Sequence, residues 1–244
     1  RRITSPSCGP AAGLEGAPGM GLRSSARGGS VAPMALPWIT VDRAKTADGV
    51  LELRRRAADD WLVTIAGRVL MSSRAHRSEV ALADLACAAL AGRKAPTVLI
   101  GGLGMGFTLR AALDVLPPAA RIVVAEITAA VGDWCAGELA EVSGHAVADP
   151  RVDGRIEDVA GTIATAAAAG GSYDAILLDL YEGPAAGDDA QAHPFYGARA
   201  LRAARAAAQV AARRAAAGNR CRGCGSKTLR KHAVFRLPTR SVRR

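Results

Sequence analysis

The segment "VLIGGLGMGFTLRAAL", residues 98–113, places four glycines within six positions, between an apolar run and a run with helical spacing. These glycines are Gly101, Gly102, Gly104 and Gly106. Glycine lets a backbone adopt positive φ and approach a ligand closely, and the N-terminus of the following helix offers unpaired N–H groups. The segment therefore predicts a strand, a ligand-binding loop and a helix; the alternative is a tight turn that holds no ligand.

The spacing of the glycines narrows the class of ligand. It follows GxGxG, whereas dinucleotide-binding loops follow GxGxxG. A P-loop also needs Lys and then Ser or Thr after its last glycine, and this loop lacks them. Phosphate-cradling NTPase chemistry is therefore not expected.

Apolar segments with strand character alternate with helical segments around this loop. The predicted strands are 97–101, 121–126, 151–156 and 173–180, and the predicted helices are 77–91, 106–116, 128–142, 157–169 and 197–217. Ser78 and Thr128 are expected as N-caps. Between residues 38 and 73, strands are expected at 50–56, 61–67 and 68–73. The pattern predicts an α/β fold, a Rossmann-like doubly wound parallel sheet with a small N-terminal β-domain.

The two ends of the chain differ from this middle. Residues 1–33 are rich in Gly, Pro, Ser and Arg, and we expect a disordered extension there. Residues 34–75 are assigned to the small β-sheet and residues 76–205 to the Rossmann-like domain. Residues 206–244 show no strand pattern, so the C-terminal strands are expected to be missing, and this basic tail resembles a sequence translated out of frame.

The distribution of charge and the cysteine content indicate which binding partners and which cellular compartment to expect. The net charge of +10 divides into +3 for residues 1–33, −7 for 34–189 and +14 for 190–244. The globular part is thus mildly acidic, and nucleic acid is not the expected partner, although binding through the basic ends stays open. Five cysteines without a dense pattern favour reduced thiols in a cytoplasmic protein, and no apolar stretch predicts a membrane span.

Carboxylates follow the predicted strands at the edge where α/β sheets bind ligands. Glu126 could accept both ribose hydroxyls of an adenosine-type ligand, or be a solvated strand-end acid. Asp158 could face an adenine amino group, or complement a helix dipole. Asp179 could take a proton from an amine nucleophile or hold a cation, or serve as a cap, and Glu182 could add a second negative charge or lie on the surface.

A metal site is not predicted. Cys221 and Cys224 form one CxxC pair with only His232 nearby, and a structural zinc site needs four ligands.

The motifs "VLIGGLGMGFTLRAAL", "VVAEI", "DPRV…ED" and "YDAILLD…EGP" occur in the order and spacing of the spermidine synthase family, which the chain resembles over residues 38–205. The family shares its sheet with class I S-adenosylmethionine methyltransferases. The resemblance implies that decarboxylated S-adenosylmethionine binds as a substrate and that an aminopropyl group passes to a small amine such as putrescine. It implies that the four glycines line the nucleoside site, Glu126 holds the ribose, Asp158 contacts adenine, and Asp179 orients and deprotonates the amine.

Three departures from the family pattern concern the acceptor. The family loop reads GGGDGG, and here Gly104 or Met105 replaces its Asp. The family's Tyr-His-Glu becomes Arg77-Ser78-Glu79, and the second acid of its D-x-x-D motif becomes Glu182. Glu79 and Glu182 are therefore the expected substrate-binding acids, and the acceptor amine stays open.

The sequence thus predicts an aminopropyltransferase-like enzyme without a metal, in which a homodimer is allowed. The alternatives are a methyltransferase using S-adenosylmethionine, or a non-catalytic nucleoside-binding protein of the same fold. Methyltransferases usually carry an acid two residues before the first glycine of GxGxG, and Ile100 occupies that place.

Overall fold

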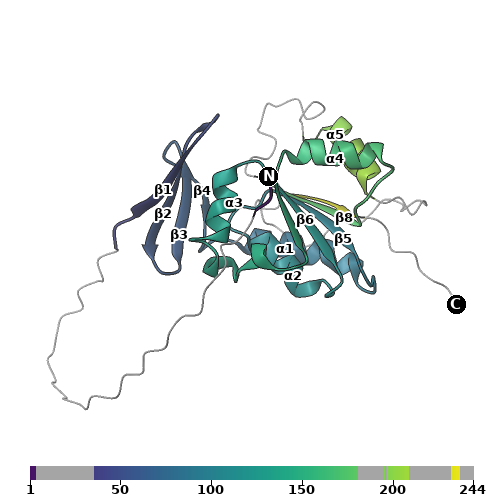
Figure 1. Ribbon diagram of the computed structural model, residues 1–244, viewed down its shortest axis with the longest axis horizontal. Helices are drawn as coiled ribbons and strands as arrows, with labels where there is room; N and C mark the ends of the chain where they lie inside the picture. Colours follow the sequence, from purple (N-terminus) through teal and green to yellow (C-terminus); the bar gives the residue numbers. More distant parts are fainter. Residues whose placement is uncertain (4–35, 181–194, 196, 209–231, 237–244) are drawn as a thin grey trace, which may run out of the picture.

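Two sheets organise the protein. The computed structural model describes residues 1–3, 36–180, 195, 197–208 and 232–236. These residues form an antiparallel sheet of four strands and a mainly parallel sheet of five. Figure 1 shows the smaller sheet at the left, the larger sheet at the right, and helix α3 (Ala129–Ala136) between them. The expected α/β fold with a small N-terminal β-domain is confirmed.

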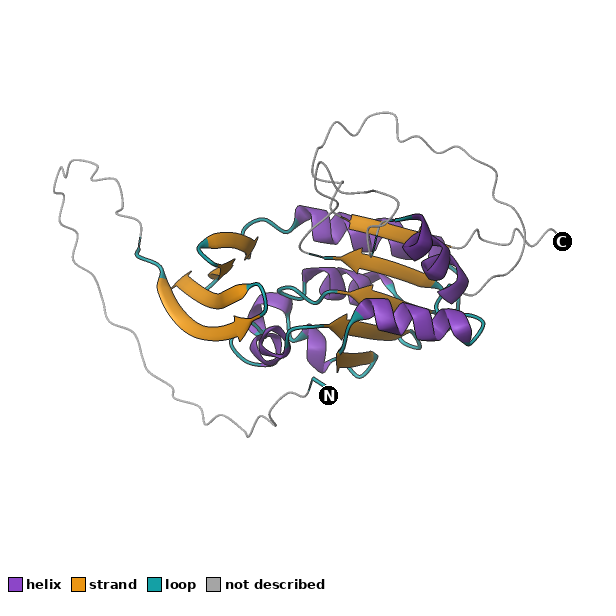
Figure 2. Cartoon of the chain, turned by 90° about the horizontal axis from the view of Figure 1, so that it is seen from above, coloured by secondary structure: helices purple, strands orange, loops and turns teal. Residues whose placement is uncertain are grey.

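The N-terminal sheet is a meander whose strands pair in chain order. Its strands are β1 (Ile39–Thr46), β2 (Gly49–Ala57), β3 (Asp60–Ile65) and β4 (Arg68–Ser72). Figure 2 shows it as a separate curved group of strands. The sequence predicted β2, β3 and β4 but not β1. That strand is mostly exposed and carries charges along its length, so it lacks the apolar alternation of a half-buried strand.

The larger sheet has the order β7-β6-β5-β8-β9. Its strands are β5 (Thr97–Gly101), β6 (Arg121–Glu126), β7 (Val152–Ile156), β8 (Ala175–Asp179) and β9 (His232–Arg236). β5 and β8 lie at the centre and read as continuous apolar runs because both of their faces are buried. All four parallel strands begin within two residues of their predicted starts.

Helices cover both faces of this sheet (Figure 1). They are α1 (Arg77–Cys87), α2 (Phe107–Val115), α4 (Val159–Ala168) and α5 (Ala198–Ala207), with short 3-10 turns η1 (Ala88–Leu90), η2 (Glu141–Ser143) and η3 (Ala146–Ala148). Ile100 and Leu177 share a core with α1 and α2, whereas Leu99 and Ile176 pack with α4 and α5. Neighbouring residues of one strand therefore serve opposite layers, as a doubly wound sheet requires. Within the described part of the chain, no helix is both long and apolar enough to span a bilayer.

Several helix ends differ from the predictions: α1 ends at Cys87 and not at 91, and α5 ends at Ala207 and not at 217, because Ala208 is extended. Helix α1 begins at Arg77 with His76 as its N-cap, so the assignment of Ser78 as cap was wrong. Thr128 does precede α3, although its side chain makes no capping hydrogen bond with the described residues. Helix α3 ends at Ala136 instead of continuing to 142, because Gly137 leaves the helical conformation with φ −114° and ψ −104°.

Segments from near the two ends of the chain lie at the two edges of the larger sheet. β9 pairs antiparallel with β8, where the sequence predicted no strand and an exposed edge. At the opposite side, Ile3 N donates to Gly154 O at 3.1 Å and Ile156 N donates to Arg1 O at 2.7 Å. Arg1–Ile3 are thus ordered against β7, unlike the disordered extension expected for residues 1–33. The rest of that extension, and the tail apart from 206–208 and β9, lie outside the described residues.

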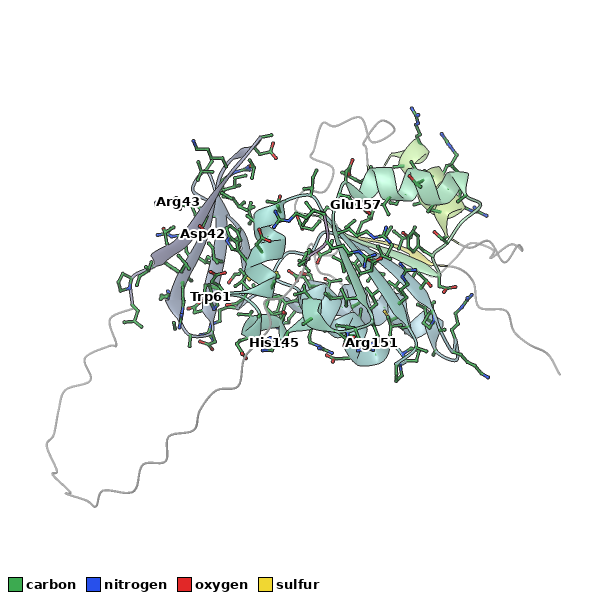
Figure 3. The ribbon with its side chains drawn as sticks, viewed as in Figure 1. Asp42, Arg43, Trp61, His145, Arg151 and Glu157 are labelled. Carbon is green, nitrogen blue, oxygen red and sulfur yellow. The ribbon has the colours of Figure 1, made fainter. Side chains whose placement is uncertain are left out.

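A side-chain hydrogen bond joins the two sheets through α3. Trp134 is buried, and its Nε1 donates to Asp42 Oδ2 of β1 at 2.6 Å. Figure 3 labels Asp42 on the N-terminal sheet. The Trp134 hydrogen bond, followed by one from the backbone of Arg43, holds the pKa of Asp42 below its ordinary value of 3.8. The N-terminal sheet is therefore fixed to the Rossmann-like domain by a specific polar contact.

Replacing Asp42 by Ala removes this acceptor and is expected to lower the free energy of unfolding by about 1 kcal/mol. Asp42→Asn keeps an acceptor oxygen, so its free energy of unfolding is expected to fall by less than half of the loss in Asp42→Ala. Because the pKa of Asp42 is depressed, the stability it contributes is present above the unfolded value and is lost as the pH falls below 3.8. Urea unfolding followed by tryptophan fluorescence at neutral and acid pH measures both effects. Equal losses for Ala and Asn would show that the hydrogen bond contributes nothing.

Candidate functional site

The glycine loop connects β5 to α2. Gly102, Gly104 and Gly106 have φ values of +87°, +57° and +84°, in the left-handed region that favours glycine. Gly101 has an ordinary strand conformation, but a Cβ there would lie 2.7 Å from Val159 Cγ2. All four glycines are therefore required, three by backbone conformation and one by close packing of α4 against β5.

Gly102 brings the loop against the end of β8. A Cβ built on Gly102 would lie 2.2 Å from the carbonyl oxygen of Asp179, which is too close for any side chain. The Gly102 N–H donates to Ala125 O of β6 at 2.9 Å. The loop therefore touches the ends of both strands that flank β5.

Glu126, the last residue of β6, holds the loop in place. Its side chain is buried; Oε2 accepts from Leu103 N at 2.9 Å and Oε1 from Thr128 N at 2.8 Å. Burial raises the pKa of Glu126, and these backbone N–H groups oppose that rise. The alternative of a solvated strand-end acid is thus excluded. The Glu126 carboxylate also borders the cavity described below.

Asp158 stands between β7 and α4 and caps the helix. Its Oδ1 accepts from Ala160 N at 2.9 Å while its backbone is extended, the arrangement of an N-cap. The side chain also borders the cavity described below. Asp158 therefore has the helix-start role, and it also lies at the cavity, where the predicted contact with an adenine amino group stays a prediction.

Asp179, the last residue of β8, is held by a threonine. Thr108 Oγ1, in the first turn of α2, donates to Asp179 Oδ2 at 2.5 Å and is buried. Thr108 was not predicted as a site residue. A single hydroxyl early in a helix indicates no functional role unless the residue that it contacts is known. Asp179 therefore has a fixed orientation at the mouth of a central strand.

Glu79 lies in the first turn of α1 and borders the same cavity. Its Oε2 accepts from Ser78 Oγ at 2.6 Å, so the hydroxyl expected to cap the helix instead orients this carboxylate. Glu182, the other expected substrate-binding acid, lies outside the described residues.

These residues meet at one cavity of about 740 Å³, within the range of small-molecule sites. Of the predicted site residues, those that line it are Gly102, Gly104, Glu79, Glu126, Asp158 and Asp179. Gly101 and Gly106 support the loop without lining the cavity. The N-terminal sheet supplies an apolar wall that the sequence did not predict: Leu51, Ile65, Leu70 and Met71. The cavity thus lies between the two sheets.

The described lining is strongly acidic. It carries six carboxylates and one guanidinium: Asp48, Glu79, Glu126, Glu157, Asp158, Asp179 and Arg68. Figure 3 labels Glu157 beside the start of α4. Such a cavity favours a cationic ligand over an anionic one. Among the described residues, no group of three or more His, Cys, Asp or Glu side chains is arranged to hold a metal ion.

The glycine loop follows the first strand of a parallel sheet, and acids lie at the ends of the neighbouring strands. This arrangement is that of a Rossmann-like fold with a site at the carboxyl edge of the sheet. Solved structures that share this fold include spermidine synthases. A spermidine synthase in complex with the transition-state analogue AdoDATO matches with a TM-score of 0.55 and 16% identity, over 70% of this chain and 53% of that one. The Thermotoga maritima enzyme matches with a TM-score of 0.53 and 16% identity, over 70% of this chain and 54% of that one.

The chain therefore has a spermidine synthase-like fold, and it spans about half the length of these two enzymes. No protein-family model matches the sequence, and no curated protein matches it either.

Gly102→Ala is expected to destabilise the protein by at least about 3 kcal/mol, because the new methyl group meets the Asp179 carbonyl at an unfavourable φ. Gly92 provides a matched control, since it has the same φ of +87° and no atom within 4 Å of a built Cβ. Gly92→Ala is expected to cost only the conformational strain, about 1 kcal/mol. Thermal or urea unfolding of both variants measures the difference. If the two losses are equal, the close approach at Gly102 does not constrain the fold.

Proposed function

We propose that the protein binds an S-adenosylmethionine-type nucleoside and transfers an aminopropyl group from decarboxylated S-adenosylmethionine to a small amine. The observation that supports this is the meeting of Glu126, Asp158 and Asp179, from the ends of different strands, around one cavity beside the glycine loop. The spermidine synthase of the same fold that holds AdoDATO agrees with a nucleoside ligand.

The nucleoside would lie along β5 and β6. The Glu126 carboxylate, at the end of β6 and bordering the cavity, would accept from the two ribose hydroxyls. The open backbone at Gly102 and Gly104 would let the sulfonium approach the sheet. Asp158 would accept from the adenine amino group, with the apolar side chain of Ile127 beside the ring.

The acceptor amine would lie between Asp179 and the N-terminal sheet. In the reaction, its neutral nitrogen attacks the propyl carbon attached to sulfur, the carbon–sulfur bond breaks, and methylthioadenosine leaves with the bonding electrons. The proton that the new ammonium loses passes to Asp179. The chain lowers the barrier mainly by holding nitrogen and carbon in line. The apolar wall that includes Leu70 and Met71 would exclude water and contact the methylene chain of the acceptor.

One observation favours a second candidate, a non-catalytic nucleoside-binding protein. At the loop position where the resembled family carries Asp, a Cβ on Gly104 would face Met71 Sδ at 3.4 Å, and the neighbouring Met105 is buried. The loop itself therefore offers the acceptor no carboxylate.

Calorimetry on the full chain with decarboxylated S-adenosylmethionine, S-adenosylmethionine and methylthioadenosine tests the nucleoside site. Mass spectrometry of reactions with a panel of mono- and diamines then detects aminopropyl or methyl transfer. Aminopropylated product supports the first candidate. Binding without any product supports the second, and absence of nucleoside binding overturns both.

Glu126→Gln is expected to weaken methylthioadenosine binding by about 10- to 100-fold, because one acceptor oxygen and the charge are lost. Wild-type binding is expected to weaken as the pH falls through the raised pKa of Glu126, beginning above the ordinary value of 4.5, since the protonated acid loses acceptor positions. The variant should show no such pH dependence. Glu157→Gln serves as a control for the loss of one negative charge at the cavity. Glu157 also borders the cavity, but the proposal gives it no contact with the ligand, and its Oε1 accepts from Thr162 Oγ1 at 2.8 Å. The same loss in both variants would contradict a specific role for Glu126.

Replacements of Asp158 separate its two roles. Serine caps a helix about as well as Asp, so Asp158→Ser is expected to change stability by less than about 0.5 kcal/mol. Its hydroxyl is too short to reach a ligand, so methylthioadenosine affinity should fall about 10-fold. Asp158→Ala should lose both affinity and about 1 kcal/mol of stability. Unchanged affinity for the Ser variant, measured by calorimetry, would leave Asp158 as a cap alone.

A further inference from the structure

We propose that Phe107 is a specificity-determining residue: its ring, stacked on His76, contacts the carbon chain of the acceptor amine and limits how bulky that amine can be. This inference rests on the proposed function. It adds to that function an aromatic side chain that neither the four glycines nor the strand-end acids include.

Phe107 begins α2 directly after the glycine loop. Its side chain is partly buried against the core that α1 and α2 share, and it borders the cavity. The next residue, Thr108, contacts Asp179 Oδ2 at 2.5 Å and Glu79 O at 3.5 Å. The start of α2 therefore lies beside both β8 and α1, so Phe107 belongs to the proposed acceptor half of the cavity.

The orientation of the Phe107 ring is set by His76. The centroids of the two rings are 4.0 Å apart and their planes differ by 15°, which is a stacked pair. His76 Nδ1 lies 2.9 Å from Ser73 O, and because a carbonyl oxygen only accepts, Nδ1 is the donor. The imidazole is therefore held in place, and it covers one face of the Phe107 ring.

Ser73 connects this pair of rings to the N-terminal sheet. It is buried, and its Oγ accepts from Trp61 N at 2.9 Å and donates to Asp59 O at 2.8 Å. Its backbone N–H donates to Trp61 O at 3.0 Å. A continuous series of contacts thus runs from β3 through Ser73 and His76 to Phe107. The place of the ring at the cavity consequently depends on how the N-terminal sheet packs against α2.

Apolar side chains border the acceptor half from both parts of the protein. Leu70 and Met71 come from the N-terminal sheet, and Phe107 comes from the Rossmann-like domain. Methylene groups gain free energy from contact with such surfaces. A ring held by stacking cannot turn aside for a wider ligand, because closely packed side chains have little space to move. The arrangement therefore favours an amine on a narrow, linear chain over one that carries a bulky group.

The test measures amine binding to the full chain saturated with methylthioadenosine, by NMR titration. The probes are butylamine, which is linear, and cyclohexylmethylamine, which carries a bulky ring. The wild type is expected to bind butylamine at least about 10-fold more tightly than cyclohexylmethylamine. Phe107→Ala removes the ring and should reduce this ratio to about 2-fold or less, while methylthioadenosine binding changes by less than about 2-fold.

Three further variants complete the design. His76→Ala removes the stacking partner and should lower the ratio in the same direction, by less than Phe107→Ala. Phe107→Leu keeps an apolar side chain for the core and should lower the ratio partway, so the test stays decisive if the Ala variant does not fold. Val115→Ala shortens an exposed side chain at the other end of α2 and should leave the ratio unchanged.

A purely structural role for Phe107 would weaken methylthioadenosine and both amines in parallel and leave the ratio unchanged, and that result would overturn the inference. So would a wild type that does not discriminate between the two amines, or one that binds methylthioadenosine but neither amine. If the wild type does not bind methylthioadenosine, the proposed function fails first, and this inference fails with it.

Discussion

The close approach of Gly102 to the Asp179 carbonyl is the constraint on which the site depends. A side chain at Gly102 would overlap that oxygen, so the loop can lie against the end of β8 only because residue 102 has no Cβ. The same loop donates a backbone hydrogen bond to Ala125 at the end of β6. One short segment thus joins three strand ends. Acids from separate parts of the sequence consequently border a single cavity.

Glu126 shows how the fold holds a buried carboxylate at this edge of the sheet. Burying a carboxylate is unfavourable unless hydrogen bonds compensate, and two backbone N–H groups, from Leu103 and Thr128, supply them. The residual effect of burial still raises its pKa. Replacing Glu126 by an apolar residue would leave these buried N–H groups without an acceptor, so the carboxylate has a role in the fold whether or not it contacts a ligand.

The sequence predicted those parts of the fold whose signals are local. The strands β5, β6 and β8 are buried on both faces and therefore read as apolar runs. Once these strands are located, the glycines and the acids that follow them can be placed at the carboxyl edge of the sheet. Features set by distant partners were missed. The exposed strand β1 has no apolar pattern, β9 pairs with β8 from far along the chain, and the role of Thr108 depends on a residue 71 positions away. The sequence also could not show that Leu70 and Met71 of the N-terminal sheet face the loop.

The proposed nucleoside half and the proposed acceptor half of the cavity depend on different parts of the structure. The nucleoside half is built by the parallel sheet alone, because Gly102, Glu126 and Asp158 all follow its strands. The acceptor half needs the N-terminal sheet as its opposite wall, and the hydrogen bond between Trp134 and Asp42 fixes that sheet to α3. A change in how the sheets pack would therefore alter the acceptor half while leaving the nucleoside half intact. Under the proposed function, acceptor choice would thus depend on the contact between the two sheets, whereas nucleoside binding would depend on the parallel sheet alone.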